Sequence, residues 1–93
     1  MTDIQTCRTV EIVNPLGLHA RASAKLVLTA EQYDAEVEVA RGGQSVSALS
    51  IMGLMMLGAG KGEHVTLTGT GPQAEDAISA IAALIADGFG ERD

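Results

Sequence analysis

The sequence predicts one α+β domain in which a mostly antiparallel sheet is covered by helices on one side. Two patterns in its 93 residues predict this fold. Short stretches of alternating apolar and polar residues are typical of half-buried strands, and between them lie stretches with apolar residues at helical spacing. Their order is strand, helix, strand, strand, helix, strand, helix. The length suits one hydrophobic core, so residues 1–93 are expected to form a single domain.

The first strand is expected over Arg8–Val13, where Val10 and Ile12 alternate with polar residues. Asn14–Gly17 contains a proline and a glycine and interrupts this strand. An alanine-rich helix is expected over Ala20–Thr29, because this stretch contains neither glycine nor proline. Its core-facing residues are predicted to be Ser23, Leu26, Val27 and Ala30.

A hairpin and a short helix are expected next. Ala35–Val39 alternates between apolar residues and glutamates, and Arg41–Gly43 provides a turn into the return strand Gln44–Ser47. Ser50 can cap the following helix, Ile51–Leu57, because a serine oxygen accepts a hydrogen bond from a first-turn N–H group.

A glycine-rich stretch ends this helix and leads into the strand Val65–Thr68. The last helix is expected to have Pro72 at its first position and to end before Gly88. Its apolar stripe comprises Ala74, Ala77, Ile78, Ile81 and Ile85.

The composition argues against nucleic-acid binding. Twelve acidic and six basic residues give a net charge of -6, whereas binding to phosphates draws on Lys and Arg. Tyr33 and Phe89 are the only aromatic residues, so stacking platforms for bases are also scarce. For the same reason we expect a core built from Val, Ile, Leu, Met and Ala.

Cysteine and histidine usage indicates the compartment and argues against a metal. Cys7 is the only cysteine, so no internal disulfide can form and a reducing cytoplasm is expected. No signal peptide is evident, and the apolar run Ile51–Leu57 is too short for membrane insertion. His19, His64 and Cys7 do not make a zinc site, and no cofactor is expected.

His19 and Arg21 stand where the first helix begins. The backbone N–H groups of a first helical turn, here those of Ala20 and Arg21, lack partners and favour an anion such as phosphate. The same positive field favours a neutral, nucleophilic imidazole at His19. The guanidinium of Arg21 suits phosphate oxygens, and Gly17 leaves the site open. This constellation predicts a histidine that becomes phosphorylated.

The same residues carry a family resemblance. Leu16–Arg21, read as LGLHAR, resembles the active-site motif of the HPr phosphocarriers of the bacterial phosphoenolpyruvate-dependent phosphotransferase system. Ser50–Gly58, read as SIMGLMMLG, resembles the regulatory-serine helix of that family. The spacing of the two motifs agrees without gaps from Val10 to Leu67. The resemblance implies an HPr-like open-faced β-sandwich of βαββαβα order, with four antiparallel strands and three helices on one face.

The resemblance also implies a function. His19 would accept a phosphoryl group on its Nδ1 nitrogen from enzyme I and pass it to an enzyme IIA, while Arg21 would steady the group. The chain would then be a stoichiometric carrier and not an enzyme. Two features differ: Ala22 stands in place of the usual proline, and Leu16 stands where sugar-transport members often carry Asn or Ser. Leu16 and the stretch from Gly71 to Gly90 resemble the nitrogen-related NPr branch, whereas Ser50–Gly58 resembles the members that an HPr kinase phosphorylates on serine, so the branch stays open.

The second helix carries a predicted docking patch, which we define as Ile51, Met52 and Met55. A contiguous exposed apolar surface usually marks an interaction site, and flexible methionines suit several partners. The resemblance implies that enzyme I and enzyme IIA dock here. It also implies that an HPr kinase/phosphorylase acts on Ser50, although simple N-capping explains Ser50 as well.

A second class of function stays open on the sequence. A small α+β regulatory module could hold an acidic ligand between His19 and Arg21 without covalent chemistry. Intact mass after incubation with enzyme I and phosphoenolpyruvate separates the two classes, because a carrier gains one covalent phosphate and a ligand-binding module gains none.

Overall fold

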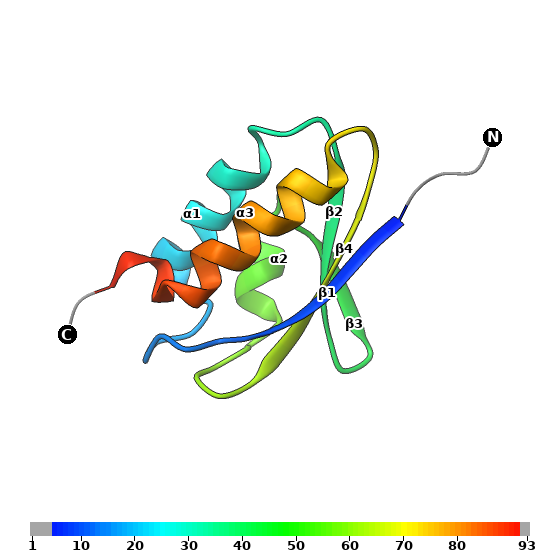
Figure 1. Ribbon diagram of the computed structural model, residues 1–93. Helices are drawn as coiled ribbons and strands as arrows, with labels where there is room; N and C mark the ends of the chain where they lie inside the picture. The colour runs from blue at the N-terminus through cyan, green and yellow to red at the C-terminus, as the bar shows by residue number, and fades with distance from the viewer. Residues whose placement is uncertain (1–4, 92–93) are drawn as a thin grey trace.

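The four strands form one antiparallel sheet in a computed structural model that describes residues 5–91. They are β1 (Gln5–Glu11), β2 (Glu36–Arg41), β3 (Gln44–Ser47) and β4 (His64–Thr70). The order across the sheet is β1-β4-β2-β3, so the first and the last strand of the chain lie side by side. The hairpin of β2 and β3 continues the sheet on the other side of β4 (Figure 1).

The helices are α1 (Ala20–Ala30), α2 (Ile51–Met56) and α3 (Ala74–Ala86), followed by a 3-10 turn, η1 (Gly88–Gly90). All three α-helices cover the same face of the sheet, and α1 packs against both α2 and α3 (Figure 1). The predicted α+β class, strand number and βαββαβα order are therefore confirmed.

The core lies between the sheet and the helices, and the periodic patterns in the sequence produce it. In β2 and β4 alternate residues are buried, and on α3 the predicted stripe is buried. The predicted inward face of α1 is buried as well. Burial of these aliphatic side chains contributes about 25 cal/mol per Å² of apolar surface removed from water.

The predicted composition of the core is wrong in two respects. Phe89 is fully buried, although an aliphatic core was expected. The core of the described residues also contains no methionine, since Met56 is exposed beside Met52 and Met55, which the predicted docking patch already places on the surface. Phe89 reaches the interior because η1 turns the chain back under the end of α3, which the periodicity of the sequence does not reveal.

Several predicted boundaries also differ. β1 ends at Glu11 and not at Val13, β2 extends to Arg41, which was expected in the turn, and β4 spans His64–Thr70 instead of Val65–Thr68. β1 begins at Gln5, because the backbone of its polar first residues pairs with the whole length of β4. Pro72 is not the first residue of α3, which begins at Ala74. Gln73 is held outside the helix by two hydrogen bonds with the backbone of Asp34, one of 3.0 Å from its N–H group and one of 2.6 Å to its side chain.

Candidate functional site

His19 is the N-cap residue of α1 and has extended backbone geometry, with φ of -75° and ψ of -179°. Its carbonyl oxygen accepts the first helical hydrogen bond from the N–H group of Ser23 at 2.9 Å. Its side chain makes no capping hydrogen bond and is 27% exposed. The imidazole is therefore partly open to solvent and is not used to stabilise the helix.

The loop before His19 is fixed by close contact with the segment that follows α2. The N–H group of Leu18 donates to the carbonyl oxygen of Ala59 at 3.0 Å. Gly17 has a φ of +62°, and a Cβ atom at this position would lie 2.3 Å from the Ala59 oxygen. Only glycine combines this conformation with this approach, so Gly17 sets the position from which α1 and His19 start.

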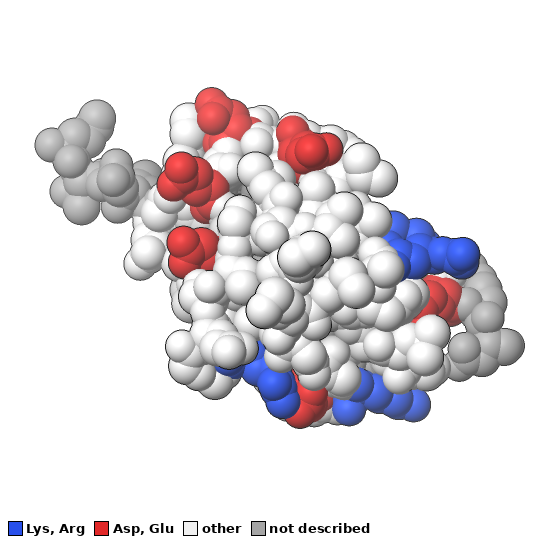
Figure 2. All heavy atoms as spheres, turned by 180° about the vertical axis from the view of Figure 1, so that it is seen from behind, with Lys and Arg blue, Asp and Glu red and all other residues white. Residues whose placement is uncertain are grey.

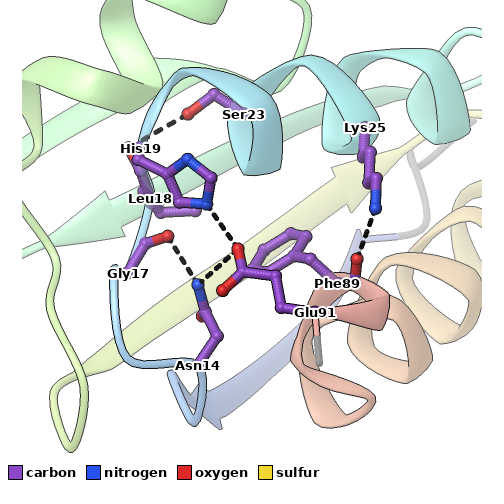
Figure 3. Close-up of polar contacts among 8 residues, drawn as sticks. All are labelled: Asn14, Gly17, Leu18, His19, Ser23, Lys25, Phe89 and Glu91. Carbon is purple, nitrogen blue, oxygen red and sulfur yellow. Dashed lines mark hydrogen bonds and ion pairs between the residues drawn. The ribbon is translucent and has the colours of Figure 1, made fainter. Parts of the chain in front are cut away.

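Glu91 lies beside the imidazole, a contact that the sequence does not predict. Its Oε2 atom accepts a hydrogen bond from Nε2 of His19 and another, of 3.2 Å, from Nδ2 of Asn14 (Figure 3). Asn14 is buried, and its Nδ2 also donates to the Gly17 carbonyl oxygen at 2.8 Å. An acidic residue 72 positions from His19 gives no local signal of this contact.

The carboxylate of Glu91 is held in its charged form. The hydrogen bond from His19 lowers the pKa of Glu91 below its usual value of 4.5, against an opposing effect of partial desolvation. The hydrogen bond from Asn14 and the positive charge of Lys25 lower this pKa further. Glu91 is thus an ionised acceptor at neutral pH.

The anion site predicted at the start of α1 has the expected backbone geometry. The first helical bond comes from Ser23, so the preceding N–H groups of Ala20 and Arg21 have no acceptor within the helix. The first turn contains no acidic residue, and Arg21 is exposed. Ala22, which replaces the usual proline of the motif, is fully buried.

Ser50 is the N-cap of α2, as the sequence predicts. Its Oγ accepts a hydrogen bond of 2.9 Å from the N–H group of Gly53. Ser50 is half-buried, and its φ and ψ of -110° and 102° are typical of a capping residue.

The docking patch is exposed on α2, while Leu54 and Leu57 of the same segment are buried. Met52 is the most exposed of the three patch residues, at 73%. Leu49 and Met56 are exposed beside it and enlarge the apolar surface beyond the prediction.

Figure 2, which views the molecule from behind, shows an uncharged centre with most acidic side chains at its upper left and basic ones at its right and lower edges.

The remaining candidates lie apart from this site. Cys7 is exposed on β1 and His64 is exposed at the start of β4. Over residues 5–91, no three His, Cys, Asp or Glu side chains lie close enough to share a metal ion. In the same part of the chain no helix has the length and apolarity needed to cross a membrane.

Comparison with known proteins identifies the family. The sequence model of the PTS-HPr family, "PTS HPr component phosphorylation site", matches residues 6–87. Phosphocarrier protein HPr of Cupriavidus necator is 52% identical over 84 residues, 90% of this chain and 94% of that protein. Phosphocarrier protein NPr of Shewanella violacea is 46% identical over 84 residues, 90% of this chain and 92% of that protein.

A solved structure agrees with the sequence relatives. The crystal structure of HPr-C-His from Thermoanaerobacter tengcongensis superposes with a TM-score of 0.89 at 41% identity, over 95% of this chain and 99% of that one. The family match spans the sheet, the three helices and the loop that carries His19. The chain therefore belongs to the HPr family of phosphocarriers of the phosphotransferase system.

Proposed function

We propose that His19 is the residue that carries the phosphoryl group, which it accepts on Nδ1 from phosphorylated enzyme I and passes to an enzyme IIA. One observation carries this proposal. Nε2 of His19 is bonded to Glu91, while among residues 5–91 Nδ1 has no hydrogen-bond partner and stands on the other side of the ring (Figure 3). Because the Glu91 carboxylate accepts a hydrogen bond from the Nε2–H group, the lone pair of His19 lies on Nδ1, and a nitrogen that attacks phosphorus needs a lone pair free of other contacts.

The chemistry requires one bond to form and one to break. The lone pair of Nδ1 forms a bond to phosphorus, while the bond between phosphorus and the donor breaks and its electron pair leaves with the donor. The N–H groups of Ala20 and Arg21 and the Arg21 guanidinium stabilise the charge on the phosphoryl oxygens. In the transfer to enzyme IIA, a bond forms between phosphorus and the acceptor while the bond between Nδ1 and phosphorus breaks and its electron pair returns to Nδ1. The protein therefore acts as a stoichiometric carrier with no cofactor.

The family match does not favour the alternative, a regulatory module that holds an acidic ligand without covalent chemistry. Relatives named HPr and NPr both match, so the proposal covers sugar uptake and nitrogen-related regulation. We also propose that the whole chain acts as one domain in the cytoplasm, where a reducing environment keeps the exposed thiol of Cys7 free.

Intact mass after incubation with enzyme I and phosphoenolpyruvate tests the proposal. The wild type should gain one phosphate that is labile in acid and stable in base. His19→Ala should fold and gain none, whereas the matched control His64→Ala, which removes the exposed second histidine, should gain it as the wild type does. Labelling of His19→Ala with the same phosphate would overturn the proposal.

Arg21 is proposed to stabilise the transferring group. Arg21→Ala should leave the melting temperature unchanged, because the side chain is exposed, and should slow transfer by about tenfold or more through loss of charge stabilisation. Arg21→Glu should be slower still. Stopped-flow or quenched-flow rates with enzyme I measure this, and a wild-type rate for Arg21→Glu would remove Arg21 from the site.

We further propose that Ile51, Met52 and Met55 dock enzyme I and enzyme IIA. Their exposure next to α1 supports this, because a partner that covers α2 also reaches the helix that carries His19. An HPr kinase/phosphorylase acting on Ser50 would change the charge of that surface.

A further inference from the structure

The segment of residues 88–91, which follows α3, brings a carboxylate to the His19 imidazole. Gly88, Phe89 and Gly90 have consecutive positive φ values of 65°, 58° and 71°. Such a conformation is unfavourable for a residue with a side chain, so tertiary contacts must hold Phe89 in it. The fully buried ring of Phe89 is one such contact.

Two polar contacts hold the segment that contains Phe89 and Glu91 against the parts of the chain before and after His19. Lys25, on α1, donates from Nζ to the Phe89 carbonyl oxygen at 2.6 Å. Asn14, in the loop before α1, donates from Nδ2 to Oε2 of Glu91 at 3.2 Å. The Glu91 carboxylate is thus bound to the loop that positions the histidine, and the backbone two residues before Glu91 is bound to α1 (Figure 3).

Asn14 occupies this place at an energetic disadvantage. Its Oδ1 atom is buried and, among the described residues, has no hydrogen-bond partner. A buried unpaired acceptor opposes folding. The two hydrogen bonds that Nδ2 of Asn14 donates, to Gly17 and Glu91, fix the orientation of the amide and offset the unpaired acceptor.

We propose that Glu91 is a positioning residue for phosphoryl transfer at His19. The inference rests on the proposed function and deepens it. By accepting the Nε2–H hydrogen bond, the carboxylate keeps the proton on Nε2 and the lone pair on Nδ1, and it restrains rotation of the ring.

Glu91 also acts on the phosphorylated ring. When Nδ1 bonds to phosphorus and the donor bond breaks, Nε2 retains its proton, so the imidazole ring gains a positive charge. The ionised carboxylate beside Nε2 compensates this charge, in the way that a buried aspartate stabilises an imidazolium in hydrolytic triads. No proton has to leave the site during the exchange.

Three variants separate these effects. Glu91→Ala removes both the acceptor and the charge, and Glu91→Gln keeps a neutral acceptor. Glu75→Gln is the control, because it removes an equal charge from an exposed residue in the first turn of α3. All three chains are full length, and melting curves establish that they fold.

The first readout is NMR of the His19 ring in the free protein, which requires no partner. In the wild type and in Glu75→Gln the ring should carry its proton on Nε2, and this proton should be protected from solvent exchange. Glu91→Ala should lose the protection and populate the other tautomer, whereas Glu91→Gln should retain both features. An Nε2–H signal in Glu91→Ala identical to that of the wild type would overturn the inference.

The second readout is transfer from enzyme I. Glu91→Ala should lower kcat by about tenfold while KM stays near the wild-type value, because Glu91 does not belong to the docking patch. Glu91→Gln should lower the phosphorylated fraction at equilibrium. If His19 is phosphorylated and Glu91→Ala has a wild-type kcat, this inference fails alone, whereas a wild type without phosphate on His19 would remove the proposed function.

Discussion

Gly17 determines at the residue scale where His19 stands. Its φ of +62° and the 2.3 Å approach that a Cβ would make to the Ala59 oxygen leave glycine as the residue that fits. The same close approach lets the N–H group of Leu18 donate a hydrogen bond to the Ala59 carbonyl oxygen, and it brings the start of α1 against the segment after α2. A backbone requirement thus serves the placement of a side chain two residues later.

Gly17→Ala should lower the free energy of unfolding by at least about 2 kcal/mol, because the left-handed conformation and the clash both oppose a methyl group. Phosphorylation of His19 should slow as the loop shifts. Urea denaturation measures the first effect. The control is Gly43→Ala, since a Cβ at Gly43 meets no atom within 4 Å, and a loss at Gly17 no larger than at Gly43 would contradict the argument.

At the scale of elements, α2 combines a structural cap with an exposed surface. Ser50 satisfies the N–H group of Gly53, and the residues that follow it present an apolar surface to solvent. A phosphate on Ser50 would add nearly two negative charges beside Ile51 and Met52. Negative charge at a helix N-terminus is well tolerated. A partner that covers the docking patch, however, would have to remove water from the phosphate, which is unfavourable.

Ser50→Asp, which carries one charge, should weaken binding of enzyme I and slow phosphorylation of His19, with a melting temperature equal to or slightly above the wild type. Ser50→Ala should bind normally and lose about 1 kcal/mol of stability with its cap. Calorimetric titration with enzyme I and melting curves separate the two effects. Wild-type binding by Ser50→Asp would leave Ser50 as a cap only.

A second element-scale feature holds the loop between α2 and β4. Arg41 donates from Nη1 to the Leu57 carbonyl oxygen at 3.0 Å and from Nη2 to Oε2 of Glu63 at 2.5 Å. Oε1 of Glu63 accepts from the N–H group of Gly60 at 2.6 Å. This clamp braces the segment against which Gly17 packs, so it supports the His19 loop indirectly.

For the whole molecule, the two carboxylates with lowered pKa values make stability depend on pH. The hydrogen bond from Gly60, followed by that from Arg41, lowers the pKa of Glu63 below 4.5, and the His19 contact does the same for Glu91. Each group binds its proton less readily when folded than when unfolded. Their stabilising contributions are therefore complete above about pH 4.5 and are lost as the pH falls through the lowered pKa values.

The free energy of unfolding should accordingly fall as the pH is lowered below about 4.5. Glu63→Gln should reduce the slope in this range and leave it unchanged near neutrality, because the variant has no proton to bind at this position. Urea denaturation at a series of pH values measures the slope. Glu75→Gln is the control, and an equal effect of both variants would show that the Glu63 clamp does not contribute.

The local order of the chain was predictable from the sequence because side-chain periodicity reports which face of an element is buried. This explains why the strands, the helices, the Ser50 cap and the position of His19 at the start of α1 were found. Pro72 shows a limit, since contacts of Gln73 with Asp34 displaced the helix start from the position that local preference favours.

The sequence by itself determined the α+β class, the His19–Arg21 junction and the exposed apolar residues of α2, because each depends on residues that are neighbours in the chain. Only the tertiary structure decided that Phe89 is in the core, that Gly17 packs against Ala59 and that Glu91 binds His19. These contacts join residues far apart in the sequence. They depend on how the chain returns to the sheet after each helix, and neither periodicity nor composition contains that information.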